Sequence, residues 1–219
     1  MIEQLLPTSV AVCESYTDRR DVVLYPDEEA AIARAVEKRR REFATVRECA
    51  RDALRALGVA PAPIVPGPRG EPGWPPGVVG SMTHCPGYRG AAVARSFDLH
   101  SVGIDAEIDQ PLPAGLIERI ALPEERDRMA GLGEWGVAVD RLLFCVKESV
   151  YKTWYPLTHR YLDFHEAAVA LCRDGTFTAV LQLDPTVGPA PGSAGWPTAL
   201  AGRWLATNGL IMSASTCGV

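Results

Sequence analysis

Two acidic side chains in a short apolar stretch are the first residues of this sequence that could do chemistry. Asp105 and Glu107 lie in the segment SVGIDAEID, residues 101–109, which has the composition of a half-buried strand. Strand alternation places both acids on the same face. Two neighbouring carboxylates in a partly dry site raise each other's pKa unless a cation lies between them. An isolated pair of this kind is more often a solvated acidic face, so the pair needs a partner elsewhere in the chain.

A predicted apolar helix containing FCVKESVYK supplies that partner. Glu148 and Lys152 are four residues apart and share a helix face, and Lys147 is next to Glu148. Alone, this spacing is typical of a surface ion pair of small energetic value. Within an apolar helix the charges should be half buried. If Asp105, Glu107 and Glu148 converge, they form an all-oxygen site suited to Mg²⁺. Lys147 and Lys152 would then neutralise phosphates bound to the same metal.

The segment GSMTHCPGY, residues 80–88, adds two hydroxyls and an imidazole, from Ser81, Thr83 and His84. A serine nucleophile would need a G-x-S-x-G turn and an orienting acid, and the sequence around Ser81 is different. Histidine with hydroxyls beside a basic helix fits phosphate binding better than acyl transfer. The basic run EKRRRE at residues 37–42 indicates a local anion.

The composition is that of an ordinary globular protein. The 219 residues are 47% hydrophobic, enough for a sizeable core, and the net charge of −5 argues against nucleic acid as a partner. Six cysteines show no C-x-x-C pair or regular spacing, which argues against structural zinc and a disulfide framework and favours reduced thiols. There is no basic leader and no apolar run of about twenty residues, so we expect a cytoplasmic protein without a membrane span.

The elements that must position these residues are helices followed by strands, twice along the chain. Residues 8–16 predict a strand, and residues 25–59 predict helix that is too long for one element and bends near residues 38–41. Short strands follow at VVGSMTH, GAAVARS and SVGIDAEI, and the last two are predicted to form a hairpin across FDLH.

The second half restarts with short helices and then a long helix at residues 140–155. Two hairpins follow, one across RDGT and one across Asn208-Gly209, and residues 184–197 predict a surface loop between them. The pattern predicts an α+β protein with two similar-sized lobes, residues 1–100 and residues 101–219.

Five segments together resemble a phosphopantetheinyl transferase: VGSMTHCPGYRGAAVARS, SVGIDAE, FCVKESVYKTWYPLT, KRRREFATVRECARDAL and RGEPGWP. The resemblance is to the monomeric, two-lobed type that serves polyketide and nonribosomal peptide synthetases, and most closely to its actinobacterial members. It covers residues 26–204. It implies the 4'-phosphopantetheinyl transferase fold, with two lobes related by a pseudo-twofold axis and the active site in the cleft between them.

The resemblance also implies an activity. Coenzyme A would be the substrate, and its 4'-phosphopantetheine arm would pass to a serine of an acyl or peptidyl carrier protein in a Mg²⁺-dependent reaction. Adenosine 3',5'-bisphosphate would be released. The protein would be a monomer in the cytoplasm with no nucleic-acid or membrane partner.

Carried onto this sequence, the resemblance assigns Asp105, Glu107 and Glu148 to Mg²⁺. Glu148 would also accept the serine proton, and Lys152 would be the second catalytic residue. Related proteins often have a lysine at the position of Pro66, which only Arg69 is near enough to replace here. The residues implied to bind coenzyme A are Arg39, Arg47, Arg69, Ser81, Met82, Thr83, His84, Lys147 and Lys152.

Two alternatives use the same residues differently. A Mg²⁺-dependent coenzyme A hydrolase would need an ordered water in place of the carrier serine. A non-catalytic module that binds carrier proteins or coenzyme A predicts loss of one of the acids or of Lys152, and all are present. Carrier proteins are typically acidic around the modified serine, so basic residues at the mouth of the cleft should attract them. The candidate docking sites are the loop at residues 111–122 and the apolar helix near Trp135.

Overall fold

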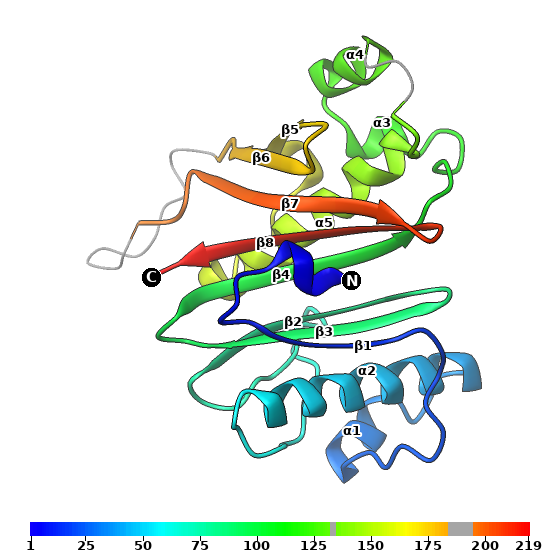
Figure 1. The fold of residues 1–219 in the computed structure, drawn as a ribbon, viewed down its shortest axis with the longest axis vertical. Coiled ribbons are helices and arrows are strands. Elements are labelled where there is room, and N and C mark those ends of the chain that lie inside the picture. The colour runs from blue at the N-terminus through cyan, green and yellow to red at the C-terminus, as the bar shows by residue number, and fades with distance from the viewer. Residues whose placement is uncertain (132–134, 184–194) are drawn as a thin grey trace.

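The computed structural model describes residues 1–131, 135–183 and 195–219 and confirms the α+β class. Two antiparallel sheets lie one above the other in Figure 1. The smaller has the strand order β1-β3-β2, and its strands are β1 (Ala11–Ser15), β2 (Val78–Cys85) and β3 (Tyr88–Arg95). The larger has the order β4-β8-β7-β6-β5, and its strands are β4 (Leu99–Ile108), β5 (Ala167–Leu171), β6 (Thr176–Leu181), β7 (Ala199–Thr207) and β8 (Leu210–Gly218).

The helix α2 (Glu37–Ala56) covers the smaller sheet, and α1 (Pro26–Ala31) lies on the side of α2 that faces away from the sheet in Figure 1. The predicted division into two helices is confirmed, but the break falls at residues 32–36, so the basic run belongs to the first turns of α2. The α2 face that includes Ala50 and Leu54 is fully buried and packs on Val93 of β3. Gly58, with φ +70°, follows the helix in the left-handed conformation that ends it.

One long helix, α5 (Val139–Thr158), lies across the face of the larger sheet that points away from the viewer in Figure 1. Four of its fully buried apolar residues, Leu142, Val146, Val150 and Trp154, lie four positions apart and form an apolar stripe along the helix. The remaining helices are short: η1 (Ile2–Leu5), α3 (Ile117–Ile120), α4 (Pro123–Gly131) and η2 (Phe164–Glu166). No helix in the described ranges combines the length and hydrophobicity needed to cross a bilayer.

The strands pair differently from the sequence prediction at one place. The hairpin expected across FDLH is wrong, because β3 pairs with β1 and β2 while β4 pairs with β8. The chain therefore crosses from one sheet to the other between Arg95 and Leu99. Both hairpins of the second half are confirmed, and Asn208 and Gly209 have the positive φ values that a tight turn requires. Residues 184–194 of the predicted loop lie outside the described residues.

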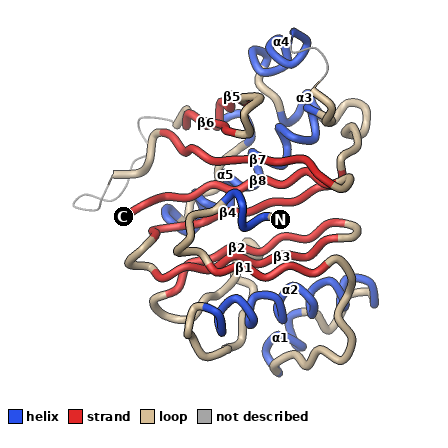
Figure 2. The backbone as a smooth tube through the Cα atoms, in the orientation of Figure 1, coloured by secondary structure: helices blue, strands red, loops and turns tan. Residues whose placement is uncertain are grey.

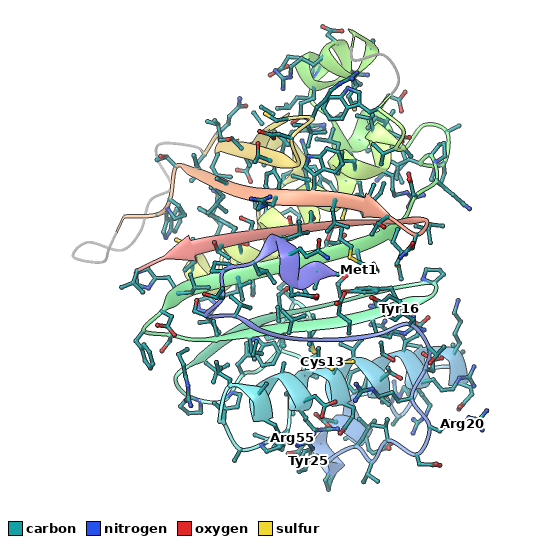
Figure 3. The ribbon with its side chains drawn as sticks, in the orientation of Figure 1. Met1, Cys13, Tyr16, Arg20, Tyr25 and Arg55 are labelled. Carbon is teal, nitrogen blue, oxygen red and sulfur yellow. The ribbon has the colours of Figure 1, made fainter. Side chains whose placement is uncertain are left out.

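An apolar core joins the two sheets. Tyr88 of β3, Ile104 of β4 and Met212 of β8 are fully buried in one cluster, together with Ile2 from the N-terminal segment. Figure 2 shows that segment between the sheets, and Figure 3 labels Met1 there and Cys13 where β1 meets α2. Since β4 begins at Leu99, the predicted lobe boundary at residue 100 falls at its start, and the division into lobes stays a prediction.

Candidate active site

The close approach of β4 and α5 brings together residues that are far apart in the sequence, such as Asp105 and Lys152. A Cβ at Gly103 would overlap the Ser149 carbonyl oxygen and the Thr153 side chain, so only glycine lets the helix lie this close to the strand. One helical turn beyond Ser149, α5 presents Lys152 to β4. Its Nζ lies 2.7 Å from Asp105 Oδ1 and also donates to the Ile104 carbonyl oxygen at 3.2 Å.

The two strand acids have different partners. Asp105 is 5% exposed, and its Oδ1 accepts from both Lys152 and Thr83. Its Oδ2 is buried and has no hydrogen-bond partner among the described residues. Glu107 is half buried and accepts from Arg141 Nη1 at 2.9 Å. One buried carboxylate oxygen is therefore left to be satisfied by something else.

The acids influence each other as the sequence predicted. Burial raises the pKa of Glu107, and Asp105 adds to this effect against the opposing Arg141. Burial also raises the pKa of Glu148, with Lys152 opposing the shift and Asp105 and Glu107 adding to it. Burial lowers the pKa of Lys152, but Asp105 and Glu148 outweigh that effect and raise it. The site is an acidic group partly neutralised by one lysine and one arginine.

These residues fit a hard divalent cation in chemistry, although they are not gathered around one point. No group of three Asp, Glu, His or Cys side chains among the described residues is arranged as a metal site. Lys152 and Arg141 instead hold Asp105 and Glu107. The donors are all carboxylate oxygens, the Oδ2 of Asp105 is unpaired, and burial raises the pKa of Glu148 with a further contribution from Asp105 and Glu107. Each observation is one that Mg²⁺ would answer.

A cavity of about 460 Å³, here called the cationic compartment, lies between α1, α2, β2 and Lys152. Three arginines, His84 and Lys152 line it, and Glu42 is its only acidic lining residue among the described residues. The arginines are Arg34, Arg39 and Arg47. This excess of positive charge suits a phosphate group.

Within this compartment Arg47 and His84 are tuned by burial. Arg47 is 5% exposed, donates from Nε to the Ile64 carbonyl oxygen at 3.1 Å, and stacks on Phe43. Burial lowers the pKa of Arg47 to about 9. Burial, reinforced by Arg39 and Lys152, lowers the pKa of His84 to about 4. The neutral His84 ring accepts from Arg39 through Nε2, and this contact holds the Arg39 guanidinium in the lining of the compartment.

A second cavity of about 520 Å³, the aromatic compartment, adjoins the first at Gly70, Met82 and Lys152. Glu148 and Arg69 also line it, and Arg69 stacks on Tyr161. Its aromatic lining residues are Trp74, His100, Tyr151, Tyr155 and His159. Pro66, by contrast, lines the cationic compartment, so Arg69 does not stand where a lysine at position 66 would.

Ser81 and Thr83 lie at the edge of these cavities, but their hydroxyls face β4. Ser81 Oγ accepts from the Ile104 N–H and Thr83 Oγ1 from the Ala106 N–H, each at 3.1 Å. The two contacts advance together along β2 and β4, so these strands run in the same direction and are joined by side chains. Both hydroxyls are therefore used inside the protein. The expected lining of the nucleotide pocket by Ser81, Met82 and Thr83, partly through backbone groups, stays a prediction.

Lys147 does not join the other predicted residues. It is 2% exposed on another side of α5, with its Nζ 2.7 Å from Glu125 Oε2. It also donates to the carbonyl oxygens of Ile120 and Phe164. The expected contact between Lys147 and a pyrophosphate is therefore corrected: the ammonium is used inside the protein.

Three features of the site were not predicted from the sequence. Arg141, which holds Glu107, is seven residues before Glu148, and this spacing of two helical turns could have placed it on the same face. Tyr151 and Tyr155 of the aromatic lining follow Glu148 by about one and two turns of α5, which helix periodicity could also have shown. Arg34 and Trp74 carried no local signal, because the bend between α1 and α2 and a loop bring them in.

Comparisons with known proteins agree with the geometry. A family model described as the 4'-phosphopantetheinyl transferase N-terminal domain matches residues 27–94, and one described as the 4'-phosphopantetheinyl transferase superfamily matches residues 101–201. The 4'-phosphopantetheinyl transferase Svp of Streptomyces mobaraensis is 52% identical over 98% of this chain and 88% of its own. PptT of Mycobacterium tuberculosis is 44% identical over 98% and 96%, and Npt of Nocardia iowensis is 43% identical over 98% of both chains.

The first family match contains β2 and nearly all of β3 of the smaller sheet. The second begins two residues after the start of β4 and contains Asp105, Glu107, Glu148 and Lys152. Full-length similarity at this level is shared with three named enzymes. The chain belongs to the 4'-phosphopantetheinyl transferase superfamily.

Proposed function

We propose that this protein transfers the 4'-phosphopantetheine arm of coenzyme A to a serine of acyl and peptidyl carrier proteins, converting the apo to the holo form. The observation that carries the proposal is the position of Lys152. It contacts Asp105 and lines both the cationic and the aromatic compartment. A pyrophosphate near Lys152 would have phosphate-binding groups on one side and an apolar surface on the other.

The cationic compartment would hold the adenosine-end phosphate. Arg39, Arg47 and His84 are its recognition groups, and Lys152 would contact the pyrophosphate. Arginine forms strong, directional hydrogen bonds to phosphate oxygens, and here both arginines are anchored to neighbouring residues. Binding energy gained at this end of coenzyme A would position the reacting phosphorus.

Asp105, Glu107 and Glu148 would hold Mg²⁺, which when bound supplies positive charge to the pyrophosphate oxygens. Glu148 would accept the proton of the carrier serine. Its raised pKa makes it a better base than an ordinary carboxylate. The serine oxygen forms a bond to the β-phosphorus, and the bond to the bridging oxygen breaks. The bridging oxygen keeps the electron pair and leaves as part of adenosine 3',5'-bisphosphate.

The protein would act as a monomer in the cytoplasm, and the clients would be acidic carrier domains. Residues 111–122 and the region near Trp135 remain the proposed docking sites. Trp135 stacks on Trp204, a residue of β7, and therefore packs against the larger sheet.

The direct test is the intact mass of an apo acyl carrier protein after incubation with this protein, coenzyme A and Mg²⁺. We expect the carrier to gain the mass of one phosphopantetheine, and we expect no gain in a parallel incubation that contains EDTA. Breakdown of coenzyme A without a carrier adduct would indicate a hydrolase instead. Binding of coenzyme A without any change in several carriers would indicate a non-catalytic module.

A further inference from the structure

The hydroxyl of Thr83 is fully used inside the protein. It accepts from the Ala106 N–H at 3.1 Å and lies 3.0 Å from Asp105 Oδ1. An N–H can only donate, so one lone pair of the hydroxyl is committed to Ala106. A carboxylate can only accept, so the single hydroxyl proton must point to Asp105. The two contacts together fix the direction of that proton.

Asp105 is held asymmetrically as a result. Its Oδ1 accepts from Thr83 and from Lys152 Nζ, while Oδ2 has no partner among the described residues. Thr83 and Lys152 would both have to move before the carboxylate could rotate and exchange the positions of Oδ1 and Oδ2. Since Asp105 is 5% exposed, water does not replace them easily.

We propose that Thr83 is a positioning residue that orients Asp105 so that Oδ2 is left free for the divalent cation. The inference rests on the proposed function, because the cation belongs to it. It concerns the Thr83 hydroxyl and is separate from the expected lining of the nucleotide pocket by Thr83. Hydrogen bonds that orient a metal-binding carboxylate typically change metal affinity by about 10- to 100-fold.

Ser81 provides a matched control on the same strand. It lies two residues before Thr83, is also 3% exposed, and accepts from the Ile104 N–H at the same distance of 3.1 Å. Its hydroxyl makes no contact with Asp105. Removing either hydroxyl leaves one buried N–H of β4 unpaired, but only the loss of Thr83 releases the carboxylate.

The test is Mn²⁺ binding in the presence of coenzyme A, measured from the electron paramagnetic resonance signal of free Mn²⁺. We expect Thr83→Val to weaken Mn²⁺ binding by roughly tenfold or more, and Thr83→Ser to keep the wild-type affinity. Ser81→Ala should lose a similar amount of thermal stability but keep its Mn²⁺ affinity. If Thr83→Val does not fold, Thr83→Cys retains size with a weaker donor and should bind Mn²⁺ less tightly than wild type.

Wild-type Mn²⁺ affinity in the folded Thr83→Val or Thr83→Cys protein would overturn the inference. Equal weakening in Ser81→Ala would also overturn it, since the effect would then come from the contact between strands. If the wild-type protein binds no Mn²⁺, the inference fails with the metal assignment. The carrier mass assay on the wild-type protein tests the proposed transfer separately.

Discussion

Two ion pairs on α5 have the same chemistry and nearly the same length but opposite surroundings. Lys147 meets Glu125 and Lys152 meets Asp105, each with a separation of 2.7 Å. Lys147 Nζ donates to one carboxylate and two carbonyl oxygens, and Glu125 also accepts from the N–H groups of Leu122 and Val169. At the second pair, by contrast, Oδ2 of Asp105 is unpaired and Lys152 is 27% exposed at two cavities.

The difference separates a structural ion pair from a candidate functional one. A buried pair whose hydrogen-bonding capacity is fully used can only hold the fold, and breaking it leaves a buried charge. A pair with an unused acceptor beside an open cavity can bind something else. The sequence hides this difference, because Lys147 is next to the predicted site residue Glu148. Successive residues of a helix point about 100° apart, so Lys147 lies on another side of α5.

The largest effect is expected at the open pair. Asp105→Ala and Glu148→Gln should each reduce transfer by at least about 10³-fold, since each removes a group that would stabilise the reacting phosphates or accept the proton. The circular dichroism spectrum should stay unchanged. Asp98→Ala, in the exposed turn before β4, is the control and should keep wild-type activity. Retained activity in either site variant would refute the acid assignment.

Replacing each lysine by methionine, one at a time, tests the difference between the two ion pairs. Lys147→Met leaves Glu125 buried without its cation and should lower the free energy of unfolding by about 3–5 kcal/mol. Lys152→Met should lower it less, because Lys152 is 27% exposed beside two cavities, and should reduce kcat by roughly 10²-fold. Urea unfolding and steady-state kinetics of both variants measure these effects. Similar stability losses in the two variants would contradict the distinction between the pairs.

Arg47→Ala should act mainly on substrate binding. A charged hydrogen bond to phosphate contributes about 1.5–3 kcal/mol, so KM for coenzyme A should rise by roughly tenfold or more with a smaller change in kcat. Arg41→Ala is a matched control, because Arg41 lies on α2 outside the cationic compartment. An equal fall in kcat and kcat/KM would assign Arg47 to the transition state instead.

The acid titration of Glu148 should report the cation. In the metal-free protein, burial raises the pKa of Glu148 above the ordinary 4.5, and a bound divalent cation should lower it again. The raised pKa means that the protonated form contributes stability at low pH, and this contribution is lost as the pH rises through the folded pKa. Glu148→Gln should therefore be more stable than wild type at neutral pH, which thermal unfolding can measure.

The smallest effect concerns His84. Its pKa of about 4 in the free protein should rise when adenosine 3',5'-bisphosphate binds, because an anion favours the protonated ring. Stability linked to the neutral ring is present above the unfolded value of 6.5 and is lost as the pH falls toward 4. Nuclear magnetic resonance titration of the ring protons follows both states. An unchanged pKa would place the phosphate elsewhere.

The sequence predicted most where the signal is local. The turn at Asn208-Gly209 needs two positive φ values, and the shared face of Glu148 and Lys152 follows from helix periodicity. The pairing of β4 could not be read from the sequence, because neighbouring strands joined by a short turn usually form a hairpin and only the tertiary core decides otherwise. The predicted contact of Lys147 with the pyrophosphate is wrong for a related reason, since its actual partner Glu125 comes from another helix, α4.

The hydroxyl contacts between β2 and β4 also bear on motion. The two sheets are joined at this edge by Ser81 and Thr83 rather than by a backbone ladder, beside the apolar core that they share. Small increases in the distance between β2 and β4 can therefore break these two side-chain hydrogen bonds while every strand pair stays intact. Hydrogen exchange at the amides of Ile104 and Ala106 would measure this separation of β2 from β4. Exchange at these amides requires the two sheets to move apart but does not require either sheet to unfold.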